Sequence, residues 1–211
     1  GVYLGDGTLT DYFIRITGDR RHDLSYFNYL SKLVFSIFGI KPAIKFDSNV
    51  AHPNNMNLEI RSKLICDYFK SLGFKAGDKI RNAAVIPAIV CEDEKLFYAC
   101  IRGLVDTDGF IGVDGKVLAI RFSNKNSALM QQIKDSVFLS GIFGIRNNPY
   151  EIGSRSQKCI DRFFELIGSS NPRHIIRYVE GRKGNLIHKK ELLGYYPKYD
   201  SLALPYILNS S

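Results

Sequence analysis

The sequence contains no run of about 18 consecutive apolar residues, and its opening GVYLGDG has neither a basic segment nor an apolar core. We therefore expect neither a membrane span nor a signal peptide, and a cytoplasmic or organellar location. It also has no low-complexity tract and no CxxC pair, so its four cysteines are expected to be buried reduced thiols rather than zinc or disulfide sites. The four histidines show no metal-ligand spacing and are expected at the surface.

Acidic residues are in deficit, because 21 Asp and Glu stand against 29 Lys and Arg, for a net charge of +8. A basic protein attracts polyanions, which makes nucleic acid the first partner to consider. The hydrophobic fraction of 45% is that of an ordinary folded protein of one domain or two small ones.

The chain also repeats itself. Residues 1–7 (GVYLGDG) match residues 103–109 (GLVDTDG) in the spacing from the first Gly to the Asp-Gly pair. Three further matches follow in the same order: 14–16 with 120–122, 37–41 with 142–146, and 67–73 with 161–168. Four collinear matches predict an internal duplication. We expect an N-terminal copy at 1–84, a linker at 85–94, a C-terminal copy at 95–170 and a basic tail at 171–211.

Each copy is predicted to contain a helix, two strands, a helix, two strands and a helix. Residues 95–107 have helical periodicity, with small residues every four positions. The N-terminal copy has the same spacing, although the helix that should carry it would begin before residue 1. Small residues let two helices approach closely, so we expect a helix interface at Gly1, Gly5, Ala99 and Gly103.

Alternating residues after each Asp-Gly pair predict strands with one apolar and one polar face. Ile14 and Ile16 would point one way and Arg15 the other, and Arg121 has the matching position in the second copy. Helices at 24–39 and 127–141 would cover the apolar faces, the first with Tyr26, Phe27, Leu30, Leu33, Val34 and Ile37. The expected fold is therefore α+β, a pseudo-twofold duplicated αββαββα unit with two antiparallel sheets and helices on one face.

Asp6 and Asp108 would each lie at the C-terminal end of a helix, just before a Gly. A carboxylate is unfavourable there unless a cation is supplied, because the helix end is already negative. If the two helices pair, both carboxylates converge with the terminal carbonyl groups. Such hard oxygen ligands favour Mg²⁺, and paired metals are suited to phosphodiester cleavage.

The repeated segments GVYLGDG (1–7) and GLVDTDG (103–109) resemble the signature motifs of the LAGLIDADG homing endonucleases, in their single-chain, two-motif form. The resemblance covers about residues 1–170 and implies a monomer with two saddle-shaped sheets in the DNA major groove. It further implies a hydrolase for intron homing that cuts both strands of a long asymmetric target and leaves staggered ends. Two or three Mg²⁺ ions would be shared by Asp6 and Asp108, with help from Gly5 and Thr107.

The resemblance also implies a Lys or Gln beside the metals, and Lys125 stands at that position. The N-terminal copy has Gly18 and Asp19 there. We therefore expect unequal half-sites and nicked intermediates.

Polar strand residues are the candidates for DNA contact, because their donors and acceptors can reach base edges. The set is Arg15, Lys45, Asn55, Asn57, Arg61, Arg121, Arg146, Arg155 and Lys158. The cations of the tail would either contact phosphates or form a solvated helix face; they are Arg173, Arg177, Arg182, Lys183, Lys189 and Lys190.

Two alternatives stay open. The first is a protein of the same fold that binds nucleic acid without cutting, either an RNA-splicing maturase with intron RNA as its partner or a transcription regulator. The presence of both acids favours the enzyme. The second is the endonuclease domain of an intein, which is disfavoured because residue 1 is neither Cys nor Ser and no His precedes Asn209.

Overall fold

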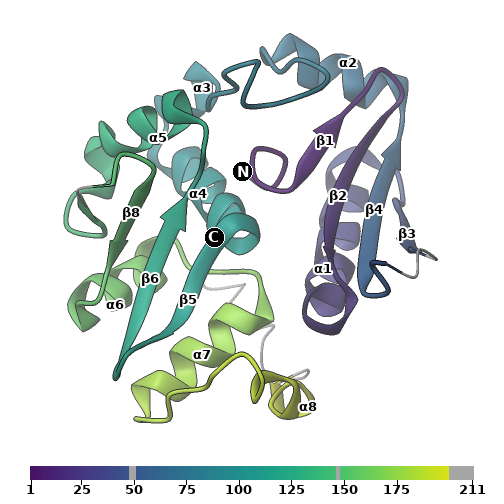
Figure 1. The fold of residues 1–211 in the computed structure, drawn as a ribbon. Coiled ribbons are helices and arrows are strands. Elements are labelled where there is room, and N and C mark those ends of the chain that lie inside the picture. Colours follow the sequence, from purple (N-terminus) through teal and green to yellow (C-terminus); the bar gives the residue numbers. More distant parts are fainter. Residues whose placement is uncertain (48–50, 146–147, 200–211) are drawn as a thin grey trace.

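The computed structural model describes residues 1–47, 51–145 and 148–199. Two four-stranded antiparallel sheets lie on opposite sides of the molecule, with helix α4 and the N-terminal turn between them (Figure 1). The expected α+β fold with two antiparallel sheets is confirmed. Among the described residues, no helix is long and apolar enough to cross a membrane.

The first half contains one sheet in the order β1-β2-β4-β3. Its strands pair in register, with Arg15 opposite Glu59 and Lys45 opposite Asn57. The elements of this half are β1 (Gly7–Leu9), β2 (Phe13–Asp19), α1 (Arg20–Phe38), β3 (Ala43–Phe46), β4 (Asn55–Arg61) and α2 (Lys63–Ser71).

The second half repeats this order as β5-β6-β8-β7. Its elements are α4 (Glu94–Asp108), β5 (Gly109–Asp114), β6 (Val117–Ser123), α5 (Ser127–Lys134), η1 (Val137–Leu139), β7 (Gly144–Ile145), β8 (Glu151–Ser154) and α6 (Gln157–Leu166). The short α3 (Ala88–Cys91) precedes it, and α7 (Pro172–Arg182), η2 (Leu192–Gly194) and α8 (Tyr196–Tyr199) follow it.

The two helices expected over the apolar sheet faces differ from their predicted extents. Helix α1 begins earlier, at Arg20, because Asp19 accepts a capping hydrogen bond from the Arg21 amide. Tyr26, Phe27 and Leu30 are buried as expected. The prediction was wrong for Leu33 and Ile37, which are 37% and 62% exposed, whereas Val34 is partly buried against the core. The second helix, α5, ends at Lys134, and a 3₁₀ turn replaces its expected continuation.

The N-terminal motif forms a turn rather than a long helix. Gly5 N and Gly7 N donate to the carbonyls of Gly1 and Tyr3, which is one turn of helical hydrogen bonding. This turn packs directly on α4, because Gly1 lies against the Cys100 carbonyl and a Cβ at Gly103 would come within 2.6 Å of Val2 N. Glycine at these positions permits the close approach.

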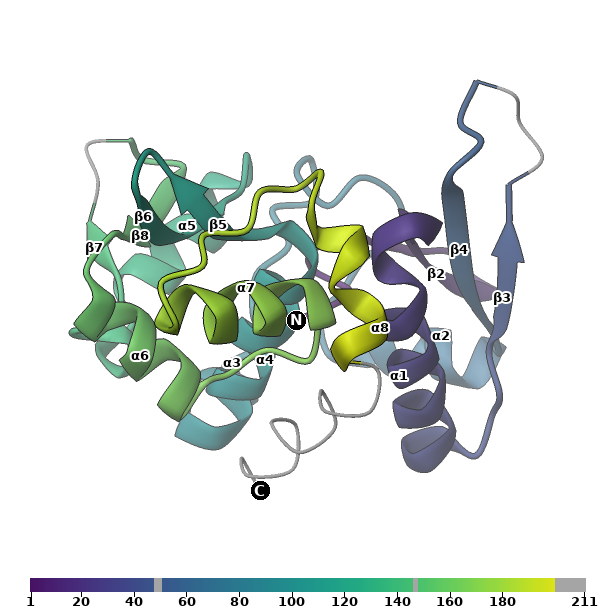
Figure 2. The ribbon, with the colours of Figure 1, turned by 90° about the horizontal axis from the view of Figure 1, so that it is seen from below.

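Residues 171–199 are part of the folded core of the molecule. Figure 2 shows α7 lying across the second half, with α8 between α7 and α1. Tyr196 of α8 donates its hydroxyl to the His22 carbonyl at the start of α1, 3.2 Å away. The segment expected as a basic tail therefore links the two halves.

Candidate active site and nucleic-acid interface

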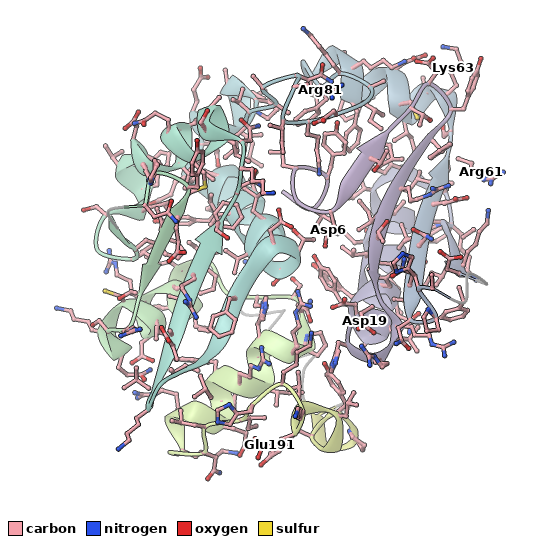
Figure 3. The ribbon with its side chains drawn as sticks, viewed as in Figure 1. Asp6, Asp19, Arg61, Lys63, Arg81 and Glu191 are labelled. Carbon is pink, nitrogen blue, oxygen red and sulfur yellow. The ribbon has the colours of Figure 1, made fainter. Side chains whose placement is uncertain are left out.

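Asp6 and Asp108 come within hydrogen-bonding distance of each other, and Figure 3 shows Asp6 between the two halves. Asp6 follows the N-terminal turn, and Asp108 is the last residue of α4. Withdrawal from water and then repulsion by Asp108 raise the pKa of Asp6 to about 6, although its residue surface is exposed. Burial likewise raises the pKa of Asp108 above its usual value. Both carboxyl groups lose stability when they are ionised next to each other. A cation bound between them would relieve that loss.

In each motif, the carbonyl just before the acid accepts a hydrogen bond from a cation that lies outside the four matched segments of the repeat. Lys79 Nζ donates to the Gly5 carbonyl, one residue before Asp6, and to the Tyr3 carbonyl at 3.1 Å. Arg173 Nη2 donates to the carbonyls of Asp106 and Thr107, both at 3.1 Å, and Thr107 is the residue before Asp108. Lys79 and Arg173 thus neutralise the negative ends of the two motifs.

Lys79 was missed by the sequence analysis. It lies in the loop before α3, where no repeat or motif singles out a lysine. Burial lowers the pKa of Lys79, while Asp108 and Asp6 oppose that shift. Only the folding of this loop over the motifs brings the ammonium group to the acids.

The Asn124-Lys125-Asn126 turn has three separate contacts. Asn124 Nδ2 donates to Asp108 Oδ2 at 3.1 Å, and the Asn126 side chain caps α5 by accepting from Leu129 N. Lys125 between them is exposed, and it lines a cavity of about 520 Å³ together with Asp108 and Lys79. The turn therefore holds Asp108 and presents Lys125 at the same cavity.

The N-terminal copy has no counterpart of Lys125. Strand β2 ends at Asp19, which is itself the cap of α1, whereas Asn124 and Lys125 separate β6 from the cap of α5. A side chain at Gly18 would be 2.9 Å from the Phe27 ring. Packing thus disfavours a basic side chain at Gly18, the position that matches Asn124 in the repeat.

The donor set fits a hard divalent cation. Burial raises the pKa of both carboxyl groups, and the charge of Asp108 raises that of Asp6 further. Both groups stand next to the carbonyls of Gly5 and Thr107, so all of the donors are oxygen. In the ranges that the structure describes, no three His, Cys, Asp or Glu side chains form a metal-binding group. A metal here would therefore be coordinated by the two acids together with backbone or solvent oxygen atoms. If the metal bound the Gly5 or Thr107 carbonyl, it would have to displace the hydrogen bond from Lys79 or Arg173.

The predicted helix interface is contacted at three of its four positions. Gly5 packs against the Thr107 side chain, and Gly1 packs against Cys100 and Gly103. Ala99, the fourth position, is exposed, and Cys100 meets Gly1 in its place.

The polar face of the first sheet carries a compact charge cluster. Glu59 is 4% exposed and accepts from Arg15 at 2.7 Å, from Lys45 at 2.7 Å and from Arg61 at 2.9 Å. These hydrogen bonds lower the pKa of Glu59 to about 2. Three cations around one anion leave the face positive. Glu59 holds these cations, the predicted DNA contacts Arg15, Lys45 and Arg61, in place. Asn57 lies beside them and accepts from Thr17 Oγ1, and Asn55 begins β4.

The second sheet has a smaller cluster. Asp114 bonds Arg155 at 2.8 Å and lies 3.8 Å from Arg121, whose guanidinium stands over the Phe110 ring. Lys158 lies in the first turn of α6 rather than on a strand. Arg146 is outside the described residues.

The expectation that the histidines lie at the surface was wrong for His174 and His22, which are 1% and 8% exposed. His174 Nε2 accepts from Arg173 Nε at 3.3 Å, so Nε2 carries no proton and Nδ1–H faces Asp106. Burial lowers the pKa of His174 to about 4. One feature of the sequence could have indicated this buried polar contact. Asp106 is charged, whereas the aligned residue of the N-terminal copy is the apolar Leu4.

Asp106 anchors α7 beneath the site. Its carboxylate accepts from the Ser169 hydroxyl and from the Ser170 amide, the latter at 2.9 Å. Arg173 continues the network to α1, where its Nη1 is 3.1 Å from Asp23. This buried polar network joins α4, α7 and α1 directly behind the two acids.

Comparison with known proteins gives one family match and several structural ones. Residues 98–171 match the family model described as a LAGLIDADG-like domain. The chain is 27% identical over 183 residues to the isomerizing glutamine-fructose-6-phosphate aminotransferase of Methanocaldococcus jannaschii, covering 80% of this chain. That region is 16% of the aminotransferase, so the chain spans about a sixth of the length of this curated relative.

Among solved structures, the chain is similar to I-DmoI in complex with DNA and Ca, with a TM-score of 0.51 and 17% identity, covering 79% of this chain and 84% of that one. It also matches full-length DUF199/WhiA from Thermotoga maritima, with a TM-score of 0.48 and 16% identity, covering 95% of this chain and 64% of that one. The I-DmoI match shows a shared fold.

Proposed function

Because residues 98–171 match a LAGLIDADG-like domain and the chain shares the fold of I-DmoI, we propose that it is a site-specific DNA endonuclease that cuts both strands of a long asymmetric target and leaves staggered ends. The observation that carries the proposal is the convergence of Asp6 and Asp108, one from each copy, with raised pKa values. Carboxylates poised in this way are the usual protein ligands for Mg²⁺ at phosphodiester-cleaving sites.

Asp6 and Asp108 would hold two or three Mg²⁺ ions between them, with the Gly5 and Thr107 carbonyls as further donors. When bound, such ions supply a water nucleophile at neutral pH and neutralise charge on the phosphate. Asn124 keeps the Asp108 carboxylate oriented through its hydrogen bond of 3.1 Å. Lys125, in the wall of the same cavity, is placed to hold a proton or to stabilise negative charge near the scissile phosphate.

DNA binding is assigned to the polar faces of the two sheets. The charge clusters around Glu59 and Asp114 hold Arg15, Lys45, Arg61, Arg121 and Arg155 in fixed positions. Ion pairs that fix long side chains before binding reduce the entropy lost when they contact DNA. Asn55 and Asn57 add amide groups suited to base edges, and Arg146 and Lys158 complete the proposed set. A net charge of +8 favours association with the duplex.

One chain contains two copies of the motif and therefore one acid for the cleavage of each DNA strand. We propose that the protein acts as a monomer. We propose a location in the cytoplasm or in an organelle. We retain the division into copies at 1–84 and 95–170, the linker at 85–94 and the segment 171–211. Intron homing is the biological role that fits this form of the fold.

The test is selection of a target from a randomised duplex library. The protein and its Asp108→Asn variant are incubated with the library and Mg²⁺, and the bound and the cleaved molecules are sequenced. We expect one long asymmetric site to be bound by both proteins and cut only by the parent. A site that is bound but never cut would overturn the nuclease and favour the alternative of a transcription regulator, whereas selection of intron RNA over DNA would favour a maturase.

A second candidate keeps the nuclease but places it inside a host protein, as the endonuclease domain of an intein. The observation in its favour is the match to a sixth of an aminotransferase, because a similar segment there forms part of a much longer chain. Mass spectrometry of the protein purified from its natural source distinguishes the two. A chain spliced out of a larger precursor supports the intein, and translation from a separate intron reading frame supports intron homing.

A further inference from the structure

A second cavity, of about 330 Å³, shares none of its lining residues with the cavity of Lys125. Its wall includes Thr107 and Gly109, the residues on either side of Asp108, and Asp19 at the junction of β2 and α1. It is closed by Arg173 and Arg177 of α7 and by Lys189.

The two cavities are related by the internal repeat. The first joins the N-terminal motif, at Gly5, to the β6–α5 junction of the second half. The second joins the C-terminal motif, at Thr107, to the β2–α1 junction of the first half. The first cavity contains Lys79 and Lys125, whereas the second, which has no counterpart of Lys125, is supplied with cations by the segment after residue 170.

Arg177 is the unusual member of this cavity. Its residue is 8% exposed, and its Nε has no hydrogen-bond partner among the described residues. Nη1 donates to the Ile111 carbonyl at 3.0 Å, but no carboxylate of the described chain pairs with the guanidinium. A buried guanidinium without a counter-anion is unfavourable, because the charge has lost its hydration without gaining a partner.

The neighbouring groups increase this excess of positive charge. Arg173 lies close enough to Arg177 to lower its pKa further, after the larger effect of burial. The acid in the wall, Asp19, is already paired with Arg21 at 2.7 Å, and Asp23 is paired with Arg173. The cavity therefore has room for an anion and is lined by three cations; Arg173 is already paired with Asp23, whereas Arg177 and Lys189 have no carboxylate partner among the described residues.

We propose that this cavity binds a phosphate group, with Arg177 as its buried anchor and with Arg173 and Lys189 as further contacts. A planar guanidinium is well matched to a phosphate oxyanion, and a buried charge-assisted hydrogen bond is stronger than an exposed one. We assign that phosphate to the DNA backbone near the bond that is cut, and this assignment rests on the proposed function. A free phosphate-containing ligand has the same chemistry.

The experiment follows the arginine side-chain Nε–H signals by NMR while inorganic phosphate is added to the full chain at constant ionic strength. The Arg177 signal is assigned from its loss in Arg177→Lys. We expect a saturable shift of this signal in the parent. Lys189→Ala should weaken phosphate affinity about 2- to 5-fold, as for one exposed ion pair. The matched control is Lys190→Ala, which removes the adjacent exposed lysine that does not line the cavity.

The second arm adds duplex DNA in the presence of Ca²⁺, without a cleavage readout. If DNA shifts the Arg177 signal and displaces inorganic phosphate, the site takes a backbone phosphate. If phosphate shifts the signal but bound DNA does not compete, the phosphate site stands and its DNA source is wrong. A linear shift without saturation, or equal effects of Lys189→Ala and Lys190→Ala, would overturn the site even if the protein proves to cut DNA.

Discussion

Lys79 and Arg173 stand in equivalent places at the ends of the two motifs, although neither lies in a segment that is matched between the two copies. Lys79 bonds the carbonyl that precedes Asp6, and Arg173 bonds the carbonyl that precedes Asp108. A pair of acids at the ends of a helical turn and of a helix is unfavourable without positive charge, and these side chains supply it from the loop before α3 and from α7. The pseudo-symmetry of the site is therefore completed by segments that are not themselves symmetric.

Asp108→Asn should abolish cutting of both strands while changing DNA affinity by less than about threefold, because the change removes a metal-binding charge and keeps the side-chain shape. Gel-shift titration in Ca²⁺ and plasmid cleavage in Mg²⁺ measure the two effects. Asp135→Asn, which removes an exposed acid at the end of α5, is the control and should cut normally. Loss of binding in Asp108→Asn would indicate a structural role for the acid.

Lys125→Ala should slow the cut that Lys125 assists by about 10- to 100-fold. In a time course with supercoiled plasmid, the parent should accumulate nicked DNA, because the N-terminal copy has glycine at 18 and no side chain fits there. The variant should lose that burst of nicked product. Lys95→Ala, at the other end of α4, is the matched control. Equal rates for both strands in the parent would contradict the unequal site.

Asp6→Asn should stabilise the protein at pH 8 by about 1 kcal/mol, a value kept small because Asp6 is solvent-accessible. The pKa of Asp6 is raised to about 6 from 3.8, so its contribution to stability is present below pH 3.8 and is lost as pH rises through 6. The variant lacks this loss. Urea unfolding at pH 4 and at pH 8 checks the prediction, which fails if the gain is the same at both.

His174 should make the fold sensitive to acid. Its pKa is lowered from 6.5 to about 4, so its contribution is present above pH 6.5 and is lost as pH falls through 4. The loss amounts to about 2–3 kcal/mol. His174→Gln should remove this part of the pH dependence, seen as the difference between the unfolding free energies of parent and variant. His188→Gln, at an exposed histidine, should leave the parent profile unchanged.

Glu59→Gln should strengthen DNA binding and make it more salt-dependent. Removing the anion at the centre of Arg15, Lys45 and Arg61 leaves one more unit of positive charge on the polar sheet face. The slope of log affinity against log salt should steepen by about one. Glu92→Gln, an exposed acid after α3, serves as the control. An unchanged slope would place this face away from the phosphates.

The repeat made most of the fold predictable. Alternation in 13–17 and 118–123 predicted which strand residues are buried, except that Ala119 is buried as well, and the small residues Gly1, Gly5 and Gly103 anticipated the close approach of turn and helix. Helix ends were less predictable, because Leu33 and Ile37 have the periodicity of a buried stripe but extend past the sheet that would cover them. Periodicity reports which side of a helix is apolar and not how much of it has a partner.

The sequence by itself determined the duplicated α+β fold and the pair of equivalent acids, because alternation of apolar residues and the equal spacing of the two motifs can be read directly from the sequence. Only the tertiary structure decided which cations accompany those acids. Lys79 lies 73 residues after Asp6, and Arg173 lies 65 after Asp108, with no motif at either position. The same holds for His174 and Arg177, whose burial depends on α7 docking against α1 and β5. Electrostatic partners are chosen by distance in space, which a linear spacing does not record.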